Sequence, residues 1–143
     1  MFEKGVMCSD CHDSHSARTK EPDNRLCLQC HRPDVYDSPR HHFHKMDPSG
    51  LSSQINGRAS ANGPEPSGNA RLINRGEPEY VEGTGAQCVN CHMTGRYYMG
   101  NDYRRDHSFR IPSPDLTAKT GVPNACNDCH KDKTTAWSQS YWS

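Results

Sequence analysis

Apolar residues are sparse along this chain, and no stretch approaches the roughly 20 consecutive apolar residues of a transmembrane helix. Hydrophobic residues make up 31% of the 143 positions, below the usual apolar share of about 45–50%, and the mean hydropathy is −1.03. Such a chain buries too little side-chain surface to offset the entropy lost on folding. The pattern therefore predicts short elements joined by irregular segments.

Helix-starting and helix-breaking residues locate the expected elements. Pro22, Asp23 or Asn24 starts the second helical turn, Pro33 ends it, and Asn124 caps the last helix. The expected elements are, in chain order, a turn-helix over 5–15, a helical turn that contains 27–31, a third over 87–93, a strand or hairpin over the aromatic and basic stretch 96–105, an extended segment over 111–114, and a helix from 125 to about 138.

A long segment without cysteine or histidine, residues 47–87, divides the chain. It contains seven glycines and four prolines and is expected to be a loop, with at most short strands or turns at 52–58 and 70–74. A loop of this length is unusual in a compact domain unless it is functional or disordered. It is either a solvated insertion or a segment that covers a cofactor edge or contacts a neighbouring subunit.

The pattern Cys-x-x-Cys-His occurs four times, and its copies contain every cysteine of the chain. On a helical turn, positions i, i+3 and i+4 lie on one face, so each copy directs two thiols and an imidazole toward one partner. This is the signature of c-type haem attachment, in which the thiols bind the vinyl groups and the imidazole binds the iron. The four copies are Cys8, Cys11 and His12; Cys27, Cys30 and His31; Cys88, Cys91 and His92; and Cys126, Cys129 and His130.

Two other uses of the cysteines are weaker. The spacing of Cys8, Cys11, Cys27 and Cys30 also fits a four-cysteine zinc site, but such a site does not need a histidine after each second cysteine. Only nine of 143 residues are histidine, so four such histidines by chance are improbable. A disulfide framework explains the even number of cysteines but not their paired spacing.

Four covalent haems change the expected fold. They supply the large apolar surfaces that the side chains lack, so the predicted fold class is a multihaem cytochrome c, mostly irregular with short α-helices wrapped around four haems. The apo chain is expected to be largely unfolded. One domain covers residues 1–143, with a first haem pair in 1–46, the loop in 47–87 and a second haem pair in 88–143.

Each motif histidine is expected to bind one iron, and five further histidines compete for the second axial positions. We predict His15, His41, His44 and His107 as these ligands, while His42 with His44 is an open alternative to His41 with His44. An excess of histidine disfavours axial methionine, which would raise the haem potential. The rival thioethers belong to Met7, Met46, Met93 and Met99.

The charge balance and the first residues of the chain limit which functions and locations are expected. The formal net charge is zero and no long Lys/Arg block is present, so nucleic-acid binding is not expected. No signal peptide is visible before Cys8. Because c-type haem is attached outside the cytoplasm, we nevertheless expect a periplasmic or extracellular protein without a membrane span.

Several stretches resemble the bacterial multihaem cytochrome c domains with doubled Cys-x-x-Cys-His motifs. The resemblance covers nearly the whole chain except the loop, and it rests on residues 11–16, 41–44, 85–93, 104–112 and 123–130. Related tetrahaem cytochromes polymerise into extracellular filaments that conduct electrons along stacked haems. The resemblance to that group is looser and rests on size and haem density.

These features predict electron transfer through four bis-His haems rather than an enzyme. The expected partners are redox proteins or extracellular electron acceptors. The chain is expected to assemble into a homopolymer or, alternatively, to act as a soluble periplasmic electron shuttle. A reductase of a small nitrogen or sulfur oxyanion would need a haem with an open or unusual axial position, which the number of histidines disfavours. A zinc-binding interaction module is the remaining alternative.

Overall fold

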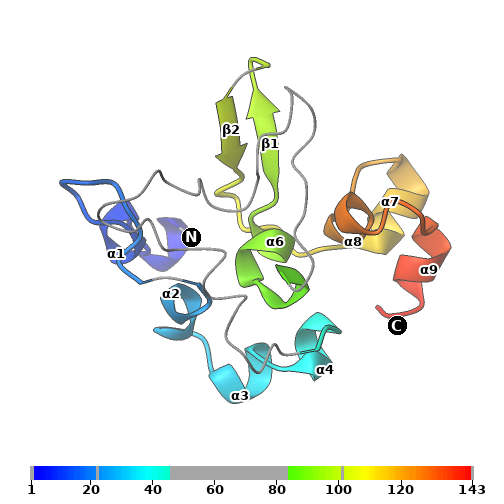
Figure 1. Ribbon diagram of the computed structural model, residues 1–143, viewed down its shortest axis with the longest axis horizontal. Helices are drawn as coiled ribbons and strands as arrows, with labels where there is room; N and C mark the ends of the chain where they lie inside the picture. The colour runs from blue at the N-terminus through cyan, green and yellow to red at the C-terminus, as the bar shows by residue number, and fades with distance from the viewer. Residues whose placement is uncertain (1, 22, 46–83, 101, 143) are drawn as a thin grey trace. The chain divides into compact units, whose positions relative to one another are not determined.

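The computed structural model describes residues 2–21, 23–45, 84–100 and 102–142 (Figure 1). The chain divides into two compact units, of which unit 1 is Met1–Gln87 and unit 2 is Cys88–Ser143. Most of the predicted loop, including the short elements expected at 52–58 and 70–74, lies outside the described residues, as do Pro22 and Met46.

In its described residues, unit 1 contains single helical turns, as the sparse apolar pattern predicts. Asp10 stabilises the first motif turn, because its carboxylate accepts a hydrogen bond from the backbone N–H of Met7 at 2.7 Å. The expectation that Pro33 ends a helix is wrong: it is the first residue of a new one, where its missing N–H costs no hydrogen bond. The elements are η1 (Phe2–Lys4), α1 (Cys8–Cys11), α2 (Arg25–Leu28), α3 (Pro33–Tyr36), α4 (Pro39–His42) and η2 (Thr84–Ala86).

Unit 2 contains longer helices and a hairpin. The predicted hairpin is confirmed as two antiparallel strands. Helix α7 was not predicted, and the helix expected from 125 to about 138 is in fact two helices. Thr134 starts the second of these, since its side chain accepts a hydrogen bond from the N–H of Trp137 at 3.2 Å. The elements are α6 (Cys88–His92), β1 (Gly95–Tyr98), β2 (Asp102–Arg105), α7 (Pro114–Thr120), α8 (Ala125–Cys129) and α9 (Thr135–Gln139).

The hairpin has one half-buried face and one exposed face. Gly95 is paired with Arg105 and Tyr97 with Tyr103, and all four positions are buried or half-buried. The other face contains Arg96, Tyr98, Asp102 and Arg104, which are exposed. A side chain at Gly95 would collide with the Tyr103 ring, so glycine is required for this packing.

Buried side chains in the described residues are mostly polar. The buried apolar residues are Ala86, Ala125 and Pro114. Buried Asn24 connects three segments, because its Nδ2 donates to Asp37 Oδ1 at 2.8 Å and to the Ala86 carbonyl at 2.9 Å. Hydrogen bonds thus connect the short helices of this irregular fold, while its wrapping around haem stays a prediction.

Candidate haem attachment sites

All four motifs adopt a helical turn. In the first, second and fourth motifs, the backbone N–H of the histidine donates to the carbonyl of the first cysteine, at distances of 2.8, 3.0 and 2.9 Å. The third motif lies entirely within α6. Each turn therefore places its two thiols and its imidazole on one side of the helix, as attachment to a single porphyrin requires.

Two motif imidazoles are held in the tautomer that binds iron. His12 Nδ1 lies 2.8 Å from the Ala17 carbonyl, and His92 Nδ1 lies 2.9 Å from the Arg110 carbonyl. A carbonyl only accepts, so each Nδ1 carries the proton and donates it. The lone pair of the neutral ring is then on Nε2, and the hydrogen bond makes that nitrogen a stronger ligand.

The other two motif imidazoles pack against aromatic rings. The ring centroids of His31 and Tyr36 lie 5.3 Å apart at an interplanar angle of 77°. Those of His130 and Trp137 lie 4.8 Å apart at 56°. Because α3 and α9 supply these aromatic rings, the helix that follows each motif restricts the orientation of its imidazole.

The thiols of the two motifs within each unit are close enough to affect one another. In unit 1, burial raises the pKa of Cys11, and the nearby thiols of Cys27 and Cys30 raise it further. In unit 2, burial raises the pKa of Cys91 to about 12, with smaller contributions from Cys126 and Cys129. Groups attached to the two motifs of one unit would therefore be neighbours.

The described residues contain neither a disulfide nor a group of side chains arranged to hold a metal ion. None of the eight cysteines, all of which lie in described ranges, is in a disulfide. Within these ranges, no group of three or more His, Cys, Asp or Glu side chains is arranged to hold a metal ion. The cysteines of unit 1 thus lie near one another without forming a four-thiol zinc site.

Two of the predicted second axial ligands, His15 and His107, lie in turns that an aspartate side chain stabilises. The Asp13 carboxylate accepts from the N–H groups of His15 at 3.1 Å and Ser16 at 2.8 Å. The Asp106 carboxylate accepts from the N–H of Ser108 at 2.8 Å, and the Nδ1 of His107 donates to the Arg105 carbonyl at 2.9 Å. His15 and His107 are both exposed, and His107 has the same tautomer as His12 and His92.

The histidines of 41–44 differ in their hydrogen bonds. His42 Nδ1 accepts from the backbone N–H of His44 at 3.1 Å, whereas His44 Nδ1 donates to the His42 carbonyl. Burial lowers the pKa of His42, which favours the neutral ring, and the hydrogen bond accepted by Nδ1 places the proton of that ring on Nε2. His41 packs against Tyr36 at 5.3 Å, and the His44 ring lies against Gly85, where any side chain would collide with it.

A buried phenol in unit 2 fits a carboxylate-bearing cofactor. Tyr97 Oη is buried and has no hydrogen-bond partner among the described residues. A buried hydroxyl without a partner is costly, so such atoms usually have one. Haem bears two propionates that accept hydrogen bonds, so this atom, the imidazole tautomers and the thiol spacing all fit haem c.

Sequence reasoning missed the polar residues that hold the motifs of unit 2. Asn90 and Asp128 lie inside the third and fourth motifs, and they bond to Arg105 and Arg96 of the hairpin. Asn127 donates to the Lys133 carbonyl at 2.9 Å. The available signal was the polar character of these positions between the cysteines, which haem attachment itself does not require.

Comparison with known proteins agrees with this geometry. A family described as "Doubled CXXCH motif" matches residues 1–35, which contain the first two motifs. The match indicates covalent haem c binding. It supports a multihaem c-type cytochrome-like domain and, in general terms, electron transfer. No curated protein and no solved structure matched the chain.

Proposed function

We propose that this protein transfers electrons through four haem c groups, one attached at each motif. The observation that carries the proposal is the shared geometry of the motifs: four helical turns, each with two thiols and a histidine on one side. The family match covers the first two motifs, and the other two repeat their spacing and their turn.

Haem iron supplies the chemistry, since it cycles between ferrous and ferric states. The eight cysteines fix the position of each group, and the motif histidines His12, His31, His92 and His130 provide one axial nitrogen each. The electrostatic influence of Cys27 and Cys30 on Cys11, and of Cys126 and Cys129 on Cys91, supports two closely spaced pairs. Close spacing favours electron transfer between the members of a pair.

We further propose that His15, His41, His44 and His107 provide the second axial nitrogens. The tautomers support His44 and His107, because their Nδ1 atoms donate to carbonyls. The same reasoning disfavours His42, whose Nδ1 accepts a hydrogen bond. Iron with two histidines has no position for a substrate, so the proposed role is electron transfer rather than catalysis.

The ligand set is tested by spectroscopy of the oxidised protein. We expect all four irons to be low-spin, with mostly negative potentials, because two imidazoles lack the potential-raising effect of methionine. Cyanide and nitrite should bind slowly or not at all. Rapid binding of either anion, together with a substantial high-spin signal, would instead favour a reductase with one open iron.

We also propose a periplasmic or extracellular location and assembly into a polymer that conducts electrons between subunits. Exposed apolar side chains in both units support an interface, since such surfaces tend to mark contacts. Met99, at the hairpin turn, is 92% exposed and has a left-handed φ of 52°, which is costly for a non-glycine residue. No helix in the described ranges is long and apolar enough to cross a membrane.

Assembly is tested on native preparations by light scattering and electron microscopy. A head-to-tail contact that does not close produces a filament, so we expect particles of variable length that are much larger than a monomer. A strictly monomeric particle at micromolar concentration would exclude the polymer and leave a soluble electron shuttle.

A further inference from the structure

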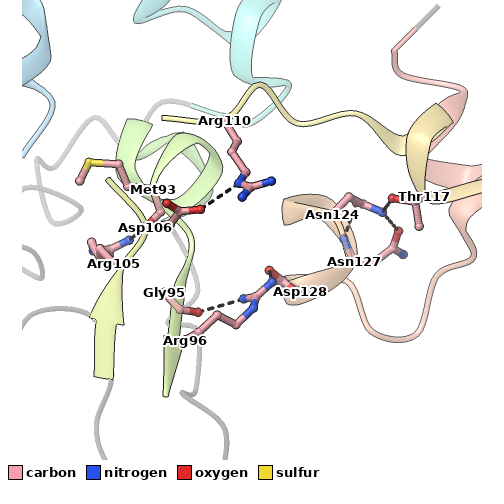
Figure 2. Close-up of polar contacts among 10 residues, drawn as sticks. All are labelled: Met93, Gly95, Arg96, Arg105, Asp106, Arg110, Thr117, Asn124, Asn127 and Asp128. Carbon is pink, nitrogen blue, oxygen red and sulfur yellow. Dashed lines mark hydrogen bonds and ion pairs between the residues drawn. The ribbon is translucent and has the colours of Figure 1, made fainter. Parts of the chain in front are cut away.

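The hairpin of unit 2 contributes one arginine to each of the two motif helices (Figure 2). Arg105, on β2, reaches α6: its Nη1 donates to the carbonyls of Val89 at 2.9 Å and Met93 at 3.0 Å. Its Nη2 donates to Asn90 Oδ1 at 3.0 Å. These three acceptors belong to the helical turn of the third motif and the residue that follows it, so Arg105 holds that turn at its C-terminal end.

Arg96, on β1, reaches the helix of the fourth motif. Its Nη2 lies 2.9 Å from Asp128 Oδ2 in α8, and its Nη1 donates to the Gly95 carbonyl at 2.9 Å. The Arg96 side chain is 52% exposed and that of Asp128 is 19% exposed. This ion pair is therefore more accessible to salt than the half-buried contacts of Arg105.

The two arginines come from opposite faces of the hairpin. Arg96 is paired with Arg104 on the exposed face, whereas Arg105 is paired with Gly95 on the half-buried face. Four paired residues on each strand hold the backbone between them. A change in the separation of the two motif helices would therefore have to break one of these contacts or distort the hairpin.

We propose that Arg96 and Arg105 are positioning residues that, through the hairpin, fix the distance and angle between the third and fourth haem sites. The proposal rests on the proposed function, because it concerns groups attached at those motifs. It assigns the hairpin a role in electronic coupling within unit 2, beyond the attachment that the motifs themselves provide.

The test is circular dichroism in the Soret region, where neighbouring haems give a paired positive and negative band that depends on their mutual geometry. Arg105→Gln removes the two nitrogens that make these three hydrogen bonds. Its spectrum minus that of the parent protein should show such a paired band. Arg105→Lys keeps the charge but cannot reach all three acceptors, so it should restore the spectrum only in part. Arg96→Gln should have a smaller effect, and high salt should reproduce it in the parent protein.

Arg104→Gln is the matched control, since Arg104 lies on the same hairpin but pairs with exposed Asp102 and lies over the Tyr98 ring. Its difference spectrum should be flat. If Arg105→Gln yields no folded protein, Asn90→Ala, which removes one acceptor, replaces it. A full haem content with an unchanged spectrum overturns the positioning role, as does an equal change in Arg104→Gln. A missing haem in the parent protein refutes the proposed function instead.

Discussion

Under denaturing conditions, the intact mass should exceed that of the 16.1 kDa chain by four haem groups. Thioether bonds survive unfolding, whereas a metal ion or a non-covalent cofactor is lost. All eight cysteines lie in motifs with the same helical turn, so none is available for another purpose. Mass spectrometry and a pyridine haemochrome assay measure the ratio directly. Two or fewer haems per chain, or bound zinc, would refute the central proposal.

A double cysteine variant of the fourth motif and a control variant of the first motif show whether haem attachment depends on a particular motif. Replacing both Cys126 and Cys129 with alanine should remove one haem and about a quarter of the haem absorbance, because the fourth motif then has no thiol. Ser9→Ala is the control: Ser9 is exposed and lies between the cysteines of the first motif, where attachment needs no particular side chain. A full set of four haems in the double variant would show that attachment does not depend on this motif.

His107→Ala should convert one of the four low-spin haems to high-spin and open that iron to cyanide. His107 is exposed, and its Nδ1 donates to the Arg105 carbonyl, so the Nε2 lone pair of the neutral ring is suited to bind a metal. Electron paramagnetic resonance and the visible spectrum of the oxidised protein measure the change. About a quarter of the low-spin signal should be replaced by a high-spin one.

His42→Ala is the matched control for this substitution. His42 is also outside the motifs, but its Nδ1 accepts a hydrogen bond from the His44 N–H, which places the proton of its neutral ring on Nε2. All four haems should stay low-spin in this variant. The reverse result, with a high-spin haem in His42→Ala and none in His107→Ala, would mean that His42 rather than His107 is an axial ligand.

The sequence predicts those features that depend on residues close together in the chain. The motif turns follow from i, i+3 and i+4 spacing, and Asn124 caps α8 as expected because its side chain accepts from the N–H of Asn127 at 3.1 Å. The hairpin follows from its aromatic residues. These predictions depend only on residues close together in the chain, so they require no knowledge of contacts with distant segments.

Features that depend on distant contacts were missed or wrongly predicted. The break between α8 and α9 is stabilised by hydrogen bonds from Asn127 to the Lys133 carbonyl and from Ser138 Oγ to Asn127 Oδ1. The local helix-start signal at Thr134, whose side chain accepts from the Trp137 N–H, was not recognised, so one continuous helix was expected. The three acceptors of Arg105 are 12 to 16 residues away in the chain and become visible only once the hairpin packs on α6.

The scarcity of buried apolar side chains among the described residues would link the abundance of this protein to the supply of the proposed haem. Among the described residues, the buried apolar ones are Ala86, Ala125 and Pro114, which contribute little hydrophobic surface, so we expect the polypeptide without haem to open readily. Proteases cleave chains in proportion to the population of such open states. If haem is attached after export, as proposed, a cell short of haem would degrade the polypeptide before attachment, and the amount that accumulates would report how much haem was available.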